Sequence, residues 1–307
     1  MGSSPIGGTL FSWDNGLGST GSVVSIEMMT ANNTPTLDLT ALPAEVMDID
    51  HAVFDIDGTL TGADSATSDE TVAALRRLDD AGIPVTLATG RILNGGANLA
   101  RRAGIHAWVI AAGGGVVWDG ENIVDAHHMP RAEVEALTEF GRDWQLMPFY
   151  FGEVDVFAHG DLLDEGGVRI LQTASEGQDF KEVAEMDWDK VTKVSYAGPA
   201  ERVDKAMVEL VKKFPQAVRS HDKFIDVPLQ GITKWQGIAT ALWQRELAPR
   251  TALGVGDSEN DISWLTQIGM PIAAPLATPD VLAVCRYRLP EMTDSVAALI
   301  DAILAAK

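Results

Sequence analysis

The sequence predicts an α/β protein: a doubly wound parallel sheet into which a smaller α+β domain is inserted. From residue 51 onward, apolar runs of strand length alternate with amphipathic stretches of helix length, and this alternation is typical of a parallel sheet with helices on both faces. Between about residues 117 and 226 the pattern changes to strands with more polar alternation and two long amphipathic helices, which indicates an α+β insert. We therefore expect a core domain at 48–116 and 227–307, and a cap domain at 117–226.

The first part of the core is expected to contain three strands separated by two helices. The strands are expected at residues 49–56 (IDHAVFDI), 83–90 (IPVTLATG) and 106–115 (HAWVIAAGGG). The first helix is expected at 68–82, with Thr67 and Glu70 at the spacing of a capping box and Gly82 as its stop. The second helix is expected around residues 92–103, between the second and third strands.

The insert and the rest of the core follow from the same periodicities. In the insert we expect strands at 122–126, 148–159 and 190–198, and helices at 131–144 and 200–214. After the insert we expect helices at 234–247, 261–268 and 295–306, and strands at 251–256 and 270–274.

Residues 1–47 are rich in Gly, Ser, Thr and Asn and have no sustained period of 2 or 3.6, so we expect a mostly disordered leader. The leader has no Lys or Arg to form the start of a signal peptide. No stretch of the chain reaches the roughly 18 apolar residues that a membrane helix needs. We therefore expect a cytoplasmic protein.

The charge of the chain restricts its partners. The chain has 44 acidic and 23 basic residues, which give a formal net charge of -21. This charge should repel nucleic acid and anionic membranes, so we expect neither as a partner. An acidic protein that binds phosphate must neutralise it locally, with a metal ion or a few placed cations. The single cysteine, Cys285, excludes an internal disulfide and a multi-cysteine zinc site. For the oligomeric state, we expect either a monomer or a small homo-oligomer.

Two aspartates end the first predicted strand. Asp55 and Asp57 are followed at once by Gly58 and Thr59, at the end of the strand where open α/β sheets bind their ligands. Two close carboxylates raise each other's pKa unless a cation lies between them. An Asx turn explains one aspartate followed by glycine, but it explains the pair with Thr59 poorly, so we interpret the pair as a candidate metal site.

Three further polar stretches follow the same logic. Thr89 comes at the end of the second strand, and Lys234 stands at a helix start, where a cation is unfavourable for the helix and suitable for binding phosphate. The segment GDSEND places Asp257, Asn260 and Asp261 around another helix start. An N-cap role would explain Asp261 but would leave Asp257 unexplained.

These four stretches resemble the four motifs of the haloacid dehalogenase-like (HAD) superfamily, in particular its Cof-type phosphatases. DIDGTL is similar to the first motif, ATGR to the second, Lys234 to the third and GDSEND to the fourth. The resemblance covers roughly residues 48–307. It implies a Rossmann-like core and a large α/β cap inserted between the second and third motifs, where the predicted insert lies.

The resemblance also implies a mechanism with Mg²⁺ as cofactor. Asp55 would attack phosphorus and form an aspartyl phosphate, and Asp57 would act as general acid and base. Phosphoryl oxygens would be held by Thr89, Lys234 and N–H groups near Gly58 and Gly90. The metal would be bound by Asp55, the backbone carbonyl of Asp57 and Asp257, with Asp261 completing or supporting the shell and Asn260 in support. Within the superfamily, an aspartate at the position of Asp57 argues for phosphoryl transfer and against dehalogenation.

The residues that would contact the leaving group of the substrate belong to the cap. A small phosphorylated metabolite is expected, with a sugar phosphate first and phosphoglycolate or a nucleotide-derived cofactor behind it. A phosphomutase would give an isomer instead of free phosphate, and a non-catalytic binding protein is the third alternative. Gly113 and Gly114 stand where the family commonly has Asn-Gly, and Trp235 stands where it commonly has Gly; we interpret the glycine run as a tight turn.

One polar segment of the insert leaves two readings open. Residues 219–228 carry Arg219, His221, Asp222 and Lys223. These side chains could bind the polar leaving group of the substrate when the cap closes. A solvated loop by which the chain returns to the core is the other reading.

Overall fold

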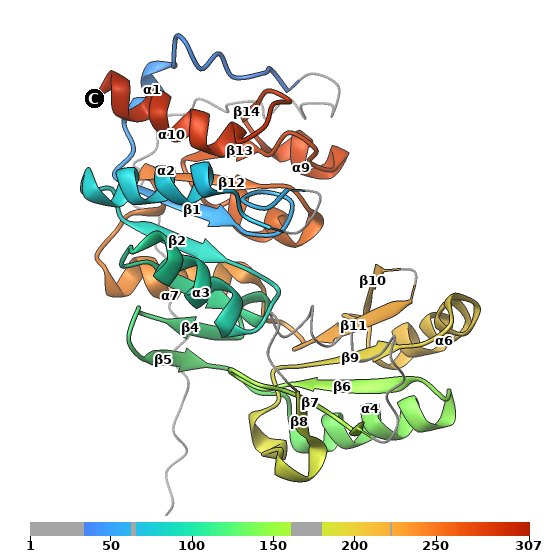
Figure 1. Ribbon diagram of the computed structural model, residues 1–307. Helices are drawn as coiled ribbons and strands as arrows, with labels where there is room; N and C mark the ends of the chain where they lie inside the picture. Colours follow the sequence, from blue (N-terminus) through green and yellow to red (C-terminus); the bar gives the residue numbers. More distant parts are fainter. Residues whose placement is uncertain (1–33, 63–65, 161–179, 222) are drawn as a thin grey trace, which may run out of the picture.

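The computed structural model describes residues 34–62, 66–160, 180–221 and 223–307. It contains a core domain and a smaller cap domain, each built on its own sheet (Figure 1). The core sheet has eight strands in the order β14-β13-β12-β1-β2-β3-β4-β5. These strands are β1 (His51–Asp55), β2 (Val85–Ala88), β3 (Trp108–Ala111), β4 (Val116–Trp118), β5 (Ile123–Ala126), β12 (Ala252–Gly256), β13 (Met270–Ala273) and β14 (Tyr287–Arg288).

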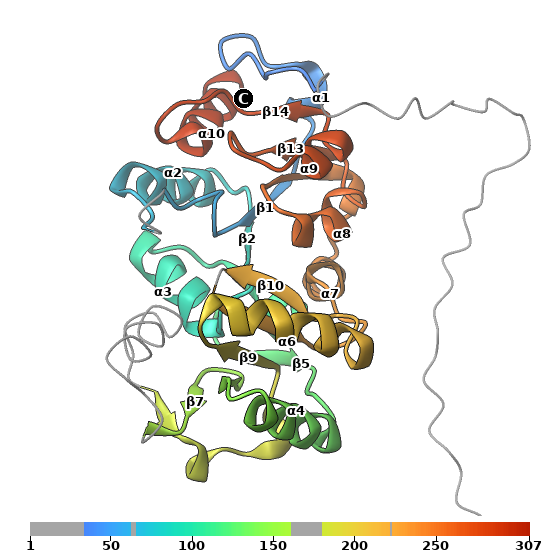
Figure 2. The same cartoon turned by 90° about the vertical axis from the view of Figure 1, so that its right-hand side faces the viewer.

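The six strands from β14 to β3 run parallel, as the alternation of strands and helices predicted. Helices α2, α3 and α10 cover one face of the sheet, and α7, α8 and α9 cover the other (Figure 2). Because both faces are covered, all five residues of β1 are buried. The doubly wound α/β core is thus confirmed. The core helices are α1 (Ala44–Met47), α2 (Asp69–Asp80), α3 (Leu93–Ala103), α7 (Lys234–Gln244), α8 (Ile262–Leu265), α9 (Pro279–Val284) and α10 (Ser295–Ala306).

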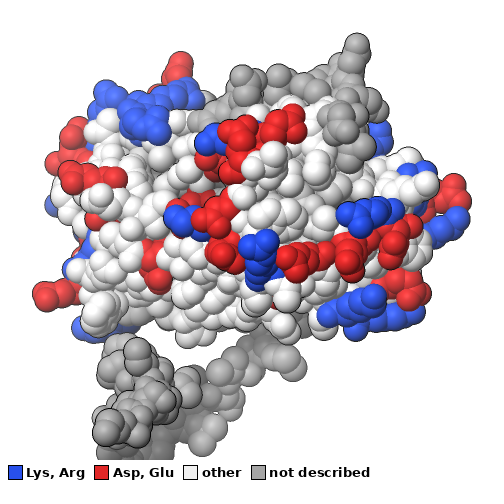
Figure 3. Space-filling model, turned by 90° about the horizontal axis from the view of Figure 1, so that it is seen from below, with Lys and Arg blue, Asp and Glu red and all other residues white. Residues whose placement is uncertain are grey.

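The cap is built on a six-stranded sheet with the order β10-β11-β9-β6-β7-β8. Helices α4 and α6 pack on one face of this sheet. On the face of the molecule seen in Figure 3, the acidic and basic side chains of the described residues are interspersed. The cap elements are α4 (Arg131–Asp143), β6 (Met147–Phe151), β7 (Val156–Ala158), β8 (Lys181–Glu182), β9 (Lys193–Ala197), α6 (Ala200–Lys213), β10 (Val218–His221) and β11 (Phe224–Pro228).

Two boundaries differ from the sequence prediction. Residues 122–126 were expected in the cap, but β4 and β5 form an antiparallel extension of the core sheet, so the chain enters the cap only after β5. Their polar alternation comes from their place at the sheet edge, where all four residues of β5 are only partly buried. The prediction of a disordered leader is wrong for residues 34–47, because Leu37 and Val46 are buried in the core. The rest of the expected leader, residues 1–33, lies outside the described residues.

The start of α2 also differs in detail. The side chain of Ser68 caps the helix by accepting a hydrogen bond from the backbone N–H of Thr71, at 3.0 Å. The capping box expected from Thr67 and Glu70 is therefore shifted by one residue, because serine and threonine at adjacent positions satisfy the same spacing rule. Helix α8 is also shorter than the predicted 261–268, since residues Glu259–Asp261 form a 3-10 turn before it.

A buried histidine at the opposite end of β1 gives a testable pH dependence. The side chain of His51 is fully buried, and burial lowers its pKa although the adjacent Asp50 opposes this. The unfolded chain therefore takes up a proton near pH 6.5 that the folded protein binds only at lower pH. We expect the unfolding free energy to fall below pH 6.5, by up to about 1.4 kcal/mol per pH unit from this group.

Urea unfolding between pH 5 and 8 would measure this slope. His51→Gln should flatten the curve, whereas the same change at the exposed His106 should leave the slope unchanged. An identical slope in wild type and His51→Gln would contradict the assignment.

Candidate active site

Three adjacent strands of the core bring the predicted residues to one edge of the sheet. Strand β1 pairs with β12 on one side and with β2 on the other, all in parallel. Asp55 is the last residue of β1, Thr89 follows β2, and Asp257 follows β12. Because the carboxyl ends of parallel strands meet at one edge, these residues of distant sequence lie together.

A buried group of charges forms the centre of the site. Lys234, the first residue of α7, donates hydrogen bonds to Oδ1 of Asp55 and, at 2.7 Å, to Oδ1 of Asp261. All three residues are at most 2% exposed. Burial opposes the charge on Lys234, but the two carboxylates outweigh it and hold its pKa above the usual value. Burial, with the negative charge of Asp261, raises the pKa of Asp55, and Lys234 works against that rise.

Asp261 is held firmly by its other partners. Its Oδ1 also accepts a hydrogen bond from Nε1 of Trp264 at 2.9 Å. Its Oδ2 accepts from the backbone N–H groups of Asp257, at 3.1 Å, and Ser258, at 3.2 Å. Both oxygens are thus occupied by donors, so Asp261 orients Lys234 and the loop that carries Asp257. Trp264 is not among the residues predicted for the site, although its position three residues after Asp261 places it one helical turn away.

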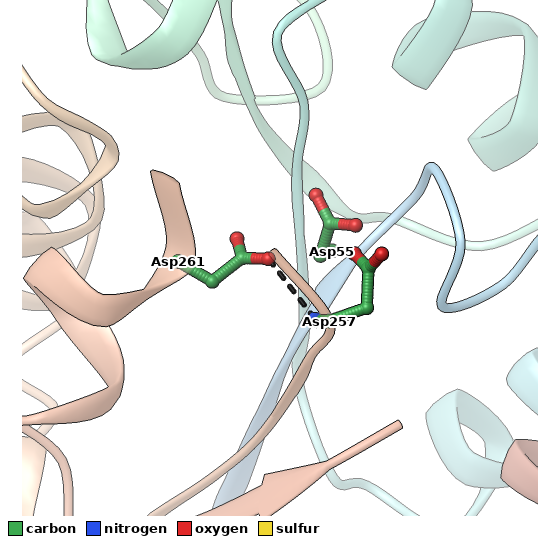
Figure 4. A group of neighbouring side chains, drawn as sticks. All are labelled: Asp55, Asp257 and Asp261. Atoms are coloured by element: carbon green, nitrogen blue, oxygen red, sulfur yellow. Dashed lines mark hydrogen bonds between the residues drawn. The ribbon is translucent and has the colours of Figure 1, made fainter. Parts of the chain in front are cut away.

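The oxygens without hydrogen bonds lie on the other two aspartates. Asp55, Asp257 and Asp261 each offer a carboxylate oxygen within 4.8 Å of the others (Figure 4). Oδ2 of Asp55 and Oδ1 of Asp257 are buried and have no hydrogen-bond partner. Buried carboxylate oxygens without donors are costly unless a cation satisfies them. The arrangement therefore fits a hard divalent cation, which prefers oxygen ligands.

Gly58 allows this close approach. Its φ of +80° lies in the left-handed region, and a Cβ at this position would lie 2.3 Å from Oδ2 of Asp257. Burial, with the negative charge of Asp261, raises the pKa of Asp257 to about 6. The N–H groups near Gly58 were expected to bind phosphate. In this structure the N–H of Gly58 itself donates to the side chain of Thr61 at 3.1 Å.

Asp57 lies outside this group of three aspartates, and its side chain is half-exposed. Nε of Arg91 donates to both of its carboxylate oxygens, at 2.9 and 3.0 Å, and Thr89 Oγ1 donates to Oδ2 at 3.3 Å. The backbone N–H of Arg91 in turn donates to Oγ1 of Thr89 at 3.0 Å. Arg91 thus fixes the orientation of Asp57, because it bonds to both oxygens of the carboxylate. Arg91 is the last residue of the ATGR motif but is not among the residues predicted for the site.

The remaining expected residues contribute differently. Asn260 is exposed, and its side chain accepts a hydrogen bond from Ser258 at 3.2 Å. Gly90 faces the cap, because its carbonyl lies 3.5 Å from Nζ of Lys193. Arg219, one of the polar residues 219–223, pairs with Asp204 on α6, and Asp222 lies outside the described residues.

The glycine run after β3 does more than turn the chain. A Cβ on Gly114 would lie 2.0 Å from the carbonyl oxygen of Thr233, and the φ of Gly114 is +109°. The backbone of this run therefore touches the start of α7, directly before Lys234. Only glycine permits such an approach, so the run helps to place the lysine.

Comparison with known proteins identifies the family of the chain. The family model for haloacid dehalogenase-like hydrolases matches residues 52–300. The chain is 32% identical over 220 residues to a phosphoglycolate phosphatase of Halorubrum lacusprofundi, a match that covers 70% of this chain and 80% of the relative. It is 22% identical over 232 residues to the 5-amino-6-(5-phospho-D-ribitylamino)uracil phosphatase of Bacillus subtilis, covering 75% and 85%.

A solved structure shares the fold over most of this chain. The haloacid dehalogenase-like hydrolase from Bacteroides thetaiotaomicron has a TM-score of 0.75 at 23% identity, covering 83% of this chain and 99% of that one. Within the part of the chain that the structure describes, no helix has the length and apolar character needed to cross a bilayer.

The family model covers most of the chain, from residue 52 to residue 300. The chain therefore belongs to the haloacid dehalogenase-like hydrolase family, in its Cof-type branch of phosphoric monoester hydrolases.

Proposed function

We propose that the protein is a Mg²⁺-dependent phosphatase that hydrolyses a small phosphorylated metabolite through an aspartyl phosphate on Asp55. The observation that carries the proposal is the environment of Asp55. One of its oxygens is bonded to the buried Lys234, and the other is buried without a partner near the unpartnered oxygen of Asp257. This combination suits a nucleophile that works beside a bound cation.

The residues of the site divide the reaction into two displacements. Asp55 attacks phosphorus while Asp57 gives its proton to the departing alkoxide oxygen, which leaves as an alcohol. Asp57 then takes a proton from water, the water oxygen attacks the same phosphorus, and the carboxylate of Asp55 is released with free phosphate. Arg91 keeps Asp57 aimed at the leaving oxygen, and Thr89 and Lys234 hold phosphoryl oxygens.

Mg²⁺ would be held by Asp55, the backbone carbonyl of Asp57 and Asp257, with Asp261 in support through its bonds to Lys234 and the Asp257 loop. When bound, Mg²⁺ supplies positive charge that offsets the charge of the phosphoryl oxygens. Gly58 and Gly90 place the loops that surround the phosphate, and Asn260 stabilises the turn that carries Asp257.

The physiological substrate is proposed only as a class. The two relatives are named for very different esters, one with an acidic two-carbon leaving group and one with a ribityl chain. We place a sugar or sugar-alcohol phosphate first. We further propose that the protein acts in the cytoplasm as a monomer or small homo-oligomer, without nucleic acid or membrane partners.

Phosphate release from sugar phosphates, phosphoglycolate, pyridoxal phosphate and one aryl phosphate tests the proposal. We expect release with Mg²⁺ and at least 100-fold less with a chelator, since one metal contributes several kcal/mol to such reactions. An isomerised sugar without free phosphate would instead identify a mutase. No release from any ester by folded, Mg²⁺-loaded protein would refute the proposal.

Thermal unfolding tests the metal site without turnover. We expect saturating Mg²⁺ to stabilise the wild type by about 2–3 kcal/mol. The pKa of Asp257 is raised from 3.8 to about 6, so the contribution of this group to the unfolding free energy is fully present below pH 3.8 and is lost as the pH rises through about 6. Asp257→Asn should therefore stabilise the metal-free protein at pH 8, by on the order of 2 kcal/mol, and lose the response to Mg²⁺. An undiminished response in this variant would contradict the assignment of Asp257.

A further inference from the structure

The cap sheet presents two different faces. Residues that alternate along its strands point either toward α4 and α6 or toward the other side. The second face is apolar and aromatic, and its buried residues include Phe149, Phe151 and Ala197. Ile92, which precedes core helix α3, is fully buried in the same cluster. This face of the cap therefore packs against the core.

A polar cluster interrupts the apolar face. Asp226 of β11, Ser195 of β9 and Phe149 of β6 lie directly opposite one another across three strands, and Lys193 and Phe151 form the neighbouring pair. Ser195 Oγ donates to Oδ1 of Asp226 at 2.5 Å, and Nζ of Lys193 lies 3.3 Å from Oδ2. Nζ of Lys193 also lies 4.1 Å from the centre of the Phe151 ring.

The cluster lies beside the reaction site. Nζ of Lys193 is 3.5 Å from the carbonyl oxygen of Gly90. Gly90 directly follows Thr89, whose hydroxyl is bonded to Asp57. Since Asp57 is the proposed proton donor to the leaving oxygen, the cluster faces the part of the substrate that departs. The cap also contacts the helix that follows this loop, because Asn94 Nδ2 of α3 donates to the carbonyl of Val154 at 2.8 Å.

The chemistry of the cluster points to one kind of leaving group. An ionised carboxylate has about four acceptor positions, and the contacts of Ser195 and Lys193 use two of them. Asp226 is 25% exposed in its side chain, so it retains capacity to accept hydrogen bonds from hydroxyl or amino groups. The positive charge of Lys193 is already matched by Asp226. A substrate carboxylate would meet Asp226 as a like charge.

We propose that Asp226, supported by Ser195 and Lys193, selects substrates whose leaving group is neutral and carries hydroxyl or amino donors, and rejects those with a carboxylate. This inference rests on the proposed phosphatase activity and deepens it. Phe149 and Phe151, which lie opposite Ser195 and Lys193, are buried in one cluster with Ile92 and so hold this part of the cap sheet against the core.

Matched pairs of esters test the inference: 2-hydroxyethyl phosphate against phosphoglycolate, and glycerol 3-phosphate against 3-phosphoglycerate. Within each pair the leaving groups differ mainly in an alcohol or a carboxylate. We expect wild type to prefer the alcohol by at least tenfold in kcat/KM. Asp226→Asn should reduce this preference at least tenfold, because it removes the repulsion and releases Lys193 to attract the carboxylate. Ser195→Ala should lower kcat/KM for the alcohols two- to tenfold without favouring the acids.

Asp204→Asn is the matched control, because Asp204 lies on α6 and pairs with Arg219; its preference should equal that of wild type. An equal preference in wild type and Asp226→Asn, or a wild-type preference for the acids, would overturn the inference while leaving the phosphatase proposal intact. If no ester is hydrolysed, calorimetric affinities of the same pairs for the same proteins decide the inference separately.

Discussion

Asp55→Asn should abolish phosphate release, with a loss of at least about 10⁴-fold in kcat, the scale seen when a covalent nucleophile is removed. Asparagine keeps the shape of the side chain and can still accept the hydrogen bond from Lys234, but it cannot form the acyl phosphate. We expect the variant to remain folded, with an unfolding free energy within about 1–2 kcal/mol of wild type.

Two measurements check this result. Acid-quenched mass spectrometry should find a phosphoryl adduct on the peptide that contains Asp55 in wild type and none in the variant. Asp143→Asn, the same change at an exposed position at the end of α4, should leave activity unchanged. If Asp55→Asn retained more than a tenth of the wild-type rate, another group would have to be the nucleophile.

Much of the site could be predicted because its residues follow strands. Asp55, Thr89 and Asp257 stand where apolar runs end, and parallel strands deliver their carboxyl ends to one edge. The order of β12, β1 and β2 in the sheet does not follow from the sequence. Because the first strand of a parallel α/β sheet commonly lies near the centre of the sheet, these three residues could still be assigned to one site. Their proposed roles remain predictions.

The contacts that sequence analysis missed are those that need the tertiary structure. Arg91 reaches Asp57 from the next strand along the sheet, and Asp226 meets Lys193 across a strand pair of the cap. The helix and strand periodicities of the sequence predict neither of these two contacts. Gly114 was interpreted as a turn residue, and only the position of α7 reveals its contact with Thr233. The extension of the core sheet by β4 and β5 was missed for a related reason: an edge hairpin has the same alternating pattern as a strand of the cap.

Lys234→Met should be the most destabilising of the substitutions considered, costing about 3–5 kcal/mol of unfolding free energy. Lys234 is the cation bonded to both Asp55 and Asp261, and all three groups are buried. Without it, two buried carboxylates remain with oxygens within 4.8 Å of each other and without the ammonium charge that offsets them. Because protonation of a carboxyl relieves this repulsion, the loss should be smaller at pH 5.5 than at pH 8. Phosphate release should also fall by about 10²–10³-fold, as when one preorganised donor is lost.

Denaturant unfolding at the two pH values measures the effect. Lys212→Met is the control, because Lys212 is exposed and its ion pair is with Glu209 in the same helix. Adding Asp55→Asn to Lys234→Met should restore part of the stability, since it removes one of the two buried charges, while it abolishes the remaining activity. This double variant separates electrostatics from packing. If the loss arose from the changed shape of the side chain, it would be independent of pH and would persist in the double variant, and the ammonium group would then have little part in holding the two aspartates together.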